Sequence, residues 1–368
     1  MIEILLAIFF ITVLLLFLSS GIWVAISMIG VSSIGMILFT SRPVGDAMAT
    51  TIWGASSSWT LTALPLFVWM GEILFRTKLS ENLFEGLAPW LQKLPGGLIH
   101  VNVVGCALFA AISGSSAATV ATVGKMSIPE LRKRKYPEKI LLGSLAGSGT
   151  LGLLIPPSII LIIYGVTVQE SIAKLFIAGI IPGIMIALIF MGYVIIWSLL
   201  NKNKMPLTEE NYSFLNKLSK SKQLIPVILL ILGVIGSIYT GIATATEAAS
   251  LGVVGALILS YFQKSLNLKT FKESLLGATK TSCMIAFILA GATFLSLAMG
   301  FTGLPRNLAI WIQNMELSPY VLIFVLMIFY IILGMFLDGI SAVVLTMAII
   351  EPMIRQAGFD MIWFGIFL

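Results

Sequence analysis

Two short segments rich in small and hydroxyl-bearing residues interrupt long apolar runs, and these are the places where the sequence could bind an ion. The first runs Ala110-Ala-Ile-Ser-Gly-Ser-Ser-Ala-Ala-Thr119. Backbone that leaves the helix at membrane depth is tolerated only where protein or a water-filled cavity surrounds it. Its freed carbonyls, together with the Ser113, Ser115 and Ser116 hydroxyls, could coordinate a hard cation such as Na⁺. The alternative interpretation is close helix packing through small residues.

The second segment is Gly147-Ser-Gly-Thr-Leu-Gly-Leu-Leu-Ile-Pro-Pro-Ser158. Pro156 and Pro157 each lack a backbone N–H and clash with the preceding helical turn. Carbonyls between Thr150 and Ile155 therefore lose their helical partners and become available to a neighbouring group. The alternative is a simple kink in a continuous helix.

Acidic residues inside apolar stretches are the other candidates. Asp338, in Leu337-Asp-Gly-Ile-Ser341, lies within a predicted membrane hairpin, where an ionisable side chain is costly and commonly functional. It could equally cap the half-helix that follows. Glu72 fits placement near the membrane interface, and Glu247 fits a capping box with Thr244. With one histidine in the chain, a multi-histidine metal site is excluded.

The overall composition identifies the solvent in which these segments must fold. The chain has 368 residues, of which 58% are hydrophobic and 10% are charged. Soluble domains carry about 25% charged residues, so a soluble enzyme or a nucleic-acid-binding protein is excluded. The net charge of +6 is therefore interpreted as basic residues in cytoplasmic loops and not as a phosphate-binding surface.

Apolar runs of near-spanning length predict the membrane helices. Two further runs, at 98–112 and 320–337, are each followed by a polar break and a second short run. If the first of these pairs is a re-entrant hairpin, 17 of the 22 basic residues share one side, which predicts a cytoplasmic basic face and a periplasmic N-terminus. The predicted runs are 2–18, 22–39, 61–75, 140–164, 175–200, 224–239, 248–262 and 281–300.

The chain also resembles itself at an offset of 225 residues. Gly114-Ser-Ser-Ala117 matches Gly339-Ile-Ser-Ala342, and the first three spans fall on the sixth, seventh and eighth. Five spans separate the two hairpins. Because this number is odd, the two copies should have opposite orientations in the membrane, as in secondary transporters with broken helices. We predict an all-α polytopic membrane protein with an inverted-repeat, ion-transporter-like fold and two re-entrant hairpins.

The predicted organisation follows from this repeat. The first copy, 1–200, holds three scaffold spans, an interfacial helix near 82–93, a hairpin at 98–130, a broken helix at 140–164 and a span at 175–200. A cytoplasmic linker covers 201–223. The second copy, 224–368, ends after a hairpin at 319–354.

The sequence resembles the large membrane subunit of TRAP (tripartite ATP-independent periplasmic) transporters, the DctM-like permeases. A minor departure is Ala245, where the family usually has proline within Thr-Pro-Thr-Glu-Ala-Ala. The matching stretches extend along nearly the whole chain: 58–67, 94–97, 110–118, 149–158, 178–183, 245–249 and 337–339.

The resemblance implies Na⁺-driven, elevator-type import of an organic anion, such as a C4-dicarboxylate or a sialic acid, across the bacterial inner membrane. It also implies two partners, a small four-helix membrane subunit and a periplasmic solute-binding protein, and no cofactor beyond the coupling ion. One Na⁺ site would comprise Ser113, Gly114, Ser115, Ser116, Gly149, Thr150, Gly152, Ile155 and Pro156. A second would include Asp338, Gly339 and Ser341, and substrate contacts are expected at Ser115, Ser116, Ser158 and Asp338.

The same offset places the second copy of the 149–158 segment near residue 374, beyond Leu368. We therefore expect the sequence to be C-terminally incomplete, lacking about 57 residues, and not to transport as written. Rival interpretations are a single-component Na⁺/carboxylate symporter with inverted repeats and, less well supported, a channel, because no charged pore ring is evident.

Overall fold

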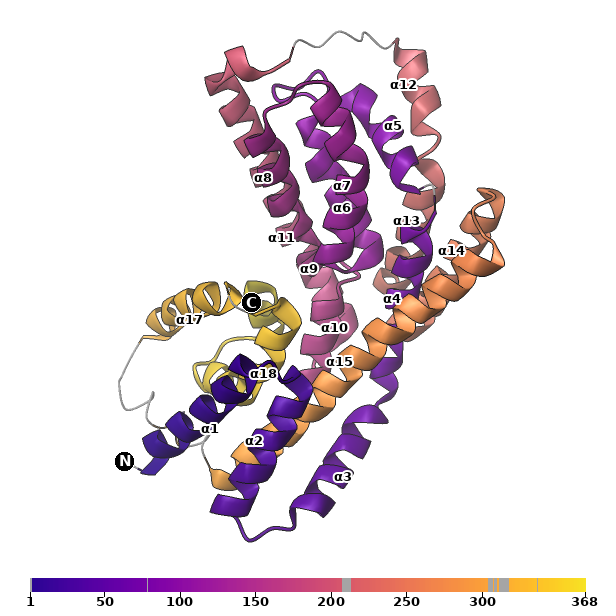
Figure 1. The fold of residues 1–368 in the computed structure, drawn as a ribbon. Coiled ribbons are helices and arrows are strands. Elements are labelled where there is room, and N and C mark those ends of the chain that lie inside the picture. Colours follow the sequence, from indigo (N-terminus) through magenta and orange to yellow (C-terminus); the bar gives the residue numbers. More distant parts are fainter. Residues whose placement is uncertain are drawn as a thin grey trace. The chain divides into compact units, whose positions relative to one another are not determined.

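The computed structural model describes residues 2–77, 79–206, 213–303, 307, 310, 318–335 and 337–368 (Figure 1). Every regular element in these ranges is a helix, which confirms the predicted all-α polytopic class. Five segments are long and apolar enough to cross a membrane, or up to seven if two bent pairs each count as one span. The five are Glu138–Thr167, Ile172–Leu200, Ala245–Phe262, Leu268–Thr302 and Gly339–Gln356.

The helices form two compact units, each described here by itself. Unit 1 comprises residues 1–61, 162–171 and 281–368, and unit 2 comprises 62–161 and 172–280. The units are interleaved along the chain, whereas the predicted repeat divides it into sequential halves. The inverted repeat stays a prediction.

Unit 1 is built on a core of Met36, Phe294 and Ala298. One of its helices, α3, was not predicted, because Gly45, Asp46, Thr50 and Thr51 interrupt its apolar pattern. Its helices are α1 (Ile2–Ser19), α2 (Val24–Phe39), α3 (Val44–Ser56), α17 (Pro319–Gly334), α18 (Gly339–Gln356) and α19 (Met361–Phe367), with the C-terminal parts of α10 (Ile159–Thr167) and α15 (Leu268–Thr302).

Unit 2 carries the hairpin and the broken helix predicted for the first copy. Within it α6 packs against α7 and α8, and α4 packs against α14. Its helices are α4 (Ala63–Phe75), α5 (Leu79–Leu91), α6 (Ile99–Ser113), α7 (Ser116–Lys133), α8 (Glu138–Gly149), α9 (Leu151–Leu154), the first residues of α10, α11 (Ile172–Leu200), α12 (Phe214–Ser221), α13 (Ile225–Tyr239), α14 (Ala245–Phe262) and the N-terminal part of α15.

The outer surface of unit 2 is apolar, as a lipid solvent requires. On α11 the side chains of Ile181, Leu188 and Leu200 are 78%, 61% and 79% exposed. In water, so many exposed apolar side chains would mark an unfilled interface. Membrane embedding explains it directly.

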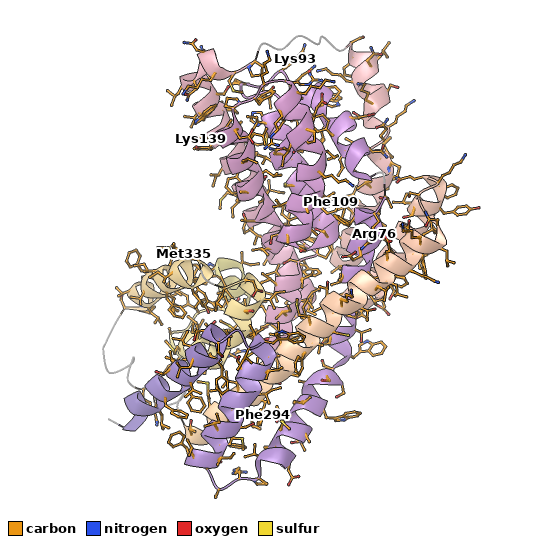
Figure 2. All side chains as sticks on the ribbon, viewed as in Figure 1. Arg76, Lys93, Phe109, Lys139, Phe294 and Met335 are labelled. Carbon is orange, nitrogen blue, oxygen red and sulfur yellow. The ribbon has the colours of Figure 1, made fainter. Side chains whose placement is uncertain are left out.

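The labelled basic side chains of unit 2 lie at different places along its helices (Figure 2). Lys93 and Lys139 lie toward the upper end of unit 2 in this view, Arg76 lies lower, and Phe109 is fully buried along α6. The basic face expected from the sequence, and the side of the membrane that it faces, stay predictions.

The predicted capping box at the start of α14 is confirmed. Thr244 accepts the N–H of Glu247 at 3.3 Å, and the Glu247 carboxylate accepts the N–H of Thr244 at 2.8 Å. Capping therefore accounts for this acidic residue without a role in transport.

Candidate functional site

The first predicted site begins at a tight turn between two helices of unit 2. Helix α6 ends at Ser113 and α7 begins at Ser116, so the segment predicted at 98–130 is a helical hairpin. Gly114 has φ +59°, a left-handed conformation that glycine adopts without a steric penalty. Ser115 then caps α7 by accepting the N–H of Ala118 at 3.4 Å.

Hydroxyl groups cross-link this turn from inside. The hydroxyls of Ser113 and Thr119 lie 2.9 Å apart, and Thr119 Oγ1 donates to the carbonyl of Ser115 at 2.7 Å. Thr119 is fully buried. It was not among the predicted site residues, although it lies one helical turn after Ser115 on the same face of α7.

The second predicted break is present where two prolines follow α9. Ile155 is extended, with φ −71° and ψ 123°, as a residue before proline prefers. The chain becomes helical again at Ile159. Ser158 is fully buried, and its hydroxyl donates to the carbonyl of Leu153 and accepts the N–H of Leu161. Ser158 thus satisfies backbone groups that the break exposes.

The hairpin turn and the helix break touch each other through their backbones. A Cβ on Gly152 would lie 2.8 Å from the carbonyl carbon of Ser115 and 2.9 Å from the Ser116 nitrogen. A Cβ on Gly114 would lie 2.5 Å from the Pro157 carbonyl oxygen, and the Gly114 carbonyl accepts the N–H of Ile159 at 3.2 Å. The structure therefore brings together the 113–116 and 149–156 segments that the family resemblance assigned to one Na⁺ site.

A third element holds the turn from its other side. A Cβ on Gly71 of α4 would lie 3.0 Å from the Cα and 3.3 Å from the carbonyl oxygen of Ser113. This glycine was not among the predicted site residues. In the sequence, Gly71 is simply a glycine within an apolar run, next to Glu72, and this pattern does not predict a contact with the turn.

The donor groups at this contact are neutral oxygens. In the described parts of the chain no three His, Cys, Asp or Glu residues are placed to hold a metal ion. Carbonyl and hydroxyl oxygens suit hard cations, in contrast to the imidazole and thiolate ligands of transition metals. The contact could therefore hold an alkali cation.

The remaining predicted ion ligands lie in unit 1. Asp338 is exposed and accepts the N–H of Ser341 at 3.3 Å, so the capping interpretation is confirmed. Gly339 is the first residue of α18, and Ser341 is 1% exposed.

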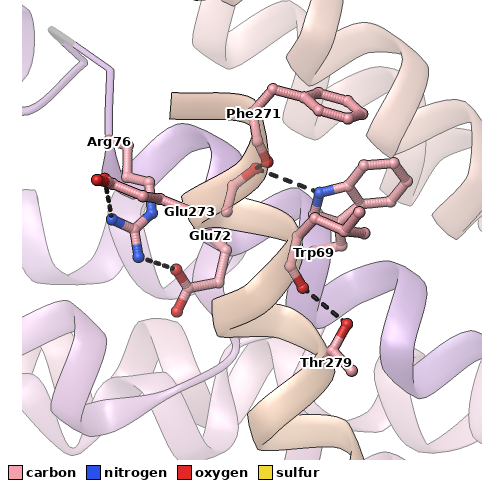
Figure 3. A network of polar contacts seen from close by, with 8 residues as sticks. Trp69, Glu72, Arg76, Phe271, Glu273 and Thr279 are labelled. Atoms are coloured by element: carbon pink, nitrogen blue, oxygen red, sulfur yellow. Dashed lines mark hydrogen bonds and ion pairs between the residues drawn. The ribbon is translucent and has the colours of Figure 1, made fainter. Parts of the chain in front are cut away.

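Glu72, the other acid within an apolar run, has a basic partner. Arg76 donates to Glu72 at 3.1 Å and to Glu273 at 3.2 Å, and the nearby Trp69 indole donates to Ser274 at 3.3 Å (Figure 3). This network joins α4 to α15 within unit 2 and accounts for Glu72 without an ion-transport role.

Comparison with known proteins identifies the family. Residues 11–368 match the family described as "Tripartite ATP-independent periplasmic transporter, DctM component". The chain is 31% identical to the C4-dicarboxylate TRAP transporter large permease protein DctM of Pseudomonas aeruginosa, over 92% of this chain and 79% of that protein. It is 31% identical to the 2,3-diketo-L-gulonate permease YiaN of Escherichia coli, over 87% of this chain and 75% of that protein.

A third relative is named for a different substrate. The chain is 30% identical to the sialic acid TRAP transporter large permease protein SiaM of Vibrio cholerae, over 94% of this chain and 81% of that protein. The relatives are transporter permeases and not enzymes. On this evidence the chain belongs to the DctM family of TRAP transporter large permeases.

Proposed function

We propose that this chain is a Na⁺-coupled importer subunit for a small organic anion. The observation that carries the proposal is the backbone contact of the Ser113–Ser116 turn with the break around Gly152. Two interrupted helices that meet in an apolar protein present carbonyl oxygens at one place, which is how secondary transporters hold their coupling ions.

The proposed ligands are oxygens that the local hydrogen bonds leave with spare lone pairs. A carbonyl oxygen has two lone pairs, and the hydroxyl oxygens of Ser113, Ser115 and Ser116 can each accept as well as donate. Gly149, Thr150, Gly152, Ile155 and Pro156 supply the opposing backbone. For the second site we propose Asp338, Gly339 and Ser341.

For the substrate we propose an organic acid. The printed names of the relatives include a C4-dicarboxylate, a sialic acid and a diketogulonate. Ser115 and Ser116 open α7, and a helix N-terminus favours a carboxylate through its free N–H groups and its dipole. Ser158 and Asp338 complete the proposed substrate contacts.

For the mechanism we propose an elevator motion in the bacterial inner membrane, with the N-terminus in the periplasm. The α6–α7 hairpin, α8 and α9 pack on one another, which supports their movement as one body. The proposed partners are a small four-helix membrane subunit and a periplasmic solute-binding protein. Co-purification with both distinguishes this function from that of a single-component symporter, which would be purified without them.

The ion coupling is tested by thermal unfolding of the purified chain in detergent. NaCl, KCl and choline chloride are compared at equal ionic strength, so that general salt effects cancel. Binding to the native state alone stabilises it by roughly 1.4 kcal/mol at ten times the dissociation constant. We expect Na⁺ to raise the unfolding midpoint and the other two cations to leave it unchanged. Identical midpoints in all three salts would contradict the proposal.

A further inference from the structure

A cavity of about 900 Å³ lies in unit 2 beyond the hairpin turn, along the later residues of α7. Its walls come from the end of α4, from α5, α7 and α12, and from the start of α15. None of the predicted ion or substrate residues lines it. Its chemistry is therefore separate from that of the 113–116 and 149–156 contact.

Charged side chains line this cavity, four of them basic and three acidic. Each acidic group already has a donor. Glu130 accepts from Arg134 at 2.8 Å, Glu273 accepts from Arg76 at 3.2 Å, and Glu85 accepts from the Gln223 amide at 3.3 Å. The acids are thus engaged by the protein itself, which weakens their repulsion of an anion.

Lys125 is different from these paired groups. It lies on α7, lines the cavity and is exposed, and it has no acidic partner in the part of the chain that the structure describes. One turn earlier, Thr122 also lines the cavity and is 2% exposed, and its hydroxyl has no hydrogen-bond partner among the described residues. On α7 an ammonium group and a hydroxyl, one helical turn apart, therefore have unused hydrogen-bonding capacity.

The start of α15 adds a second feature that favours an anion. Asn267 lines the cavity, and its side-chain oxygen accepts the N–H of Thr270 at 2.8 Å, which caps α15. Because the oxygen is used in this way, the amide NH₂ remains to donate. The positive end of the α15 dipole lies at the same place.

Four apolar side chains also line the cavity. Phe75, Phe84, Ala88 and Met126 line it beside the polar groups. Such a wall favours the carbon skeleton of an organic acid over a small inorganic ion, which would lose water and gain no apolar contact.

We propose that this cavity binds a small organic carboxylate between Lys125 of α7 and Asn267 at the start of α15. Anion binding here is independent of the ion site. We further propose that a transported acid is released from this cavity, and that part of the proposal rests on the proposed function.

Lysine footprinting on the full chain in detergent tests the proposal. The protein is pulsed with an acetylating N-hydroxysuccinimide ester, and the acetylation of each lysine is followed by peptide mass spectrometry. The probes are succinate and N-acetylneuraminate, with sulfate at matched ionic strength as the inorganic control. Two-thirds occupancy slows acetylation of Lys125 about threefold, and Lys93 and Lys139, which do not line the cavity, serve as internal controls.

We expect at least one organic acid to protect Lys125, with Lys93, Lys139 and the sulfate samples unchanged. The Asn267→Asp variant keeps a capping oxygen, since Asp and Asn cap equally well, but it replaces the NH₂ donor with a negative charge. We expect it to unfold at the wild-type midpoint and to lose the protection.

Absence of protection by both acids, or equal protection by sulfate, would overturn the proposal. Unchanged protection in the Asn267→Asp variant would overturn the assignment of Asn267. The footprint is recorded in choline as well as in sodium buffer. A failure of Na⁺ binding is thereby measured separately from a failure of this site.

Discussion

The two predicted hairpins differ at the residues that end one helix and begin the next. In unit 2, Gly114 is left-handed and packed against backbone, and the neutral Ser115 caps α7. In unit 1, Met335 ends α17 in a right-handed conformation, and the charged Asp338 caps α18. The small residues of the first turn are therefore required by close backbone packing, whereas α18 begins with a side-chain cap from an acidic residue.

The comparison also refines the sequence repeat. The offset of 225 residues maps Ser116, the first residue of α7, onto Ser341, yet α18 begins two residues earlier, at Gly339. Gly114 and Gly339 consequently occupy different positions, one before a capping residue and the other after it. Similar letters at a constant offset do not imply the same local geometry.

The largest expected effect comes from adding a methyl group where the two breaks of unit 2 meet. Gly152→Ala places a Cβ against the Ser115 and Ser116 backbone, and rigid backbone cannot yield as a side-chain end can. We expect a loss of about 2–3 kcal/mol, within the range for overpacking. Gly334→Ala, on α17, meets nothing within 4 Å and should be neutral or stabilising by up to about 1 kcal/mol. Thermal unfolding in detergent measures both, and equal midpoints would remove the distinction between the hairpins.

A smaller effect is expected from the hydroxyl network of the first turn. Thr119→Val keeps the shape of a fully buried side chain but removes its contacts with Ser113 and the Ser115 carbonyl. We expect a cost of about 1–2 kcal/mol. Thr279→Val is the matched control, because its hydroxyl also bonds a helix carbonyl but is exposed. If both variants cost the same, the buried network is not what stabilises the turn.

The smallest effect distinguishes capping from charge at the second turn. Asp338→Ala should cost about 1 kcal/mol, whereas Asp338→Asn retains a good cap and should cost only a few tenths. The Na⁺-dependent shift of the unfolding midpoint, measured on the Asn variant, separates the two roles. Capping alone predicts that the shift is retained, and its loss would assign the Asp338 charge to ion binding.

The sequence was sufficient for most of the helices, the first hairpin turn and the proline break, because apolar runs and residues such as Pro156 and Pro157 act locally. The family resemblance also predicted that the two breaks of unit 2 belong to one site. The sequence did not identify Gly71 or Thr119, because a glycine in an apolar run and a threonine in a helix have no distinctive pattern. Their roles come from tertiary neighbours, which hydrophobic periodicity does not encode.

The acidic residues likewise show that local contacts are predictable from sequence spacing and that long-range contacts are not. Capping at Thr244 and Glu247 was predictable from their spacing, because a capping box is local. The pairing of Glu72 with Arg76 also has helical spacing, but the contact of Arg76 with Glu273 joins residues far apart in sequence. The helix α3 was missed because its polar residues break the apolar pattern.

The most direct test is the Na⁺ affinity of Gly152→Ala compared with that of Gly143→Ala. Gly143 lies on α8, a few residues before the break, and a Cβ there meets nothing within 4 Å. The Na⁺ concentration that half-maximally raises the unfolding midpoint is measured for each folded variant. If the contact of the two breaks holds the ion, Gly143→Ala will match the wild type and Gly152→Ala will need at least about tenfold more Na⁺, equivalent to about 1.4 kcal/mol. A folded Gly152→Ala protein with wild-type Na⁺ affinity would contradict the assignment of the ion site to this contact.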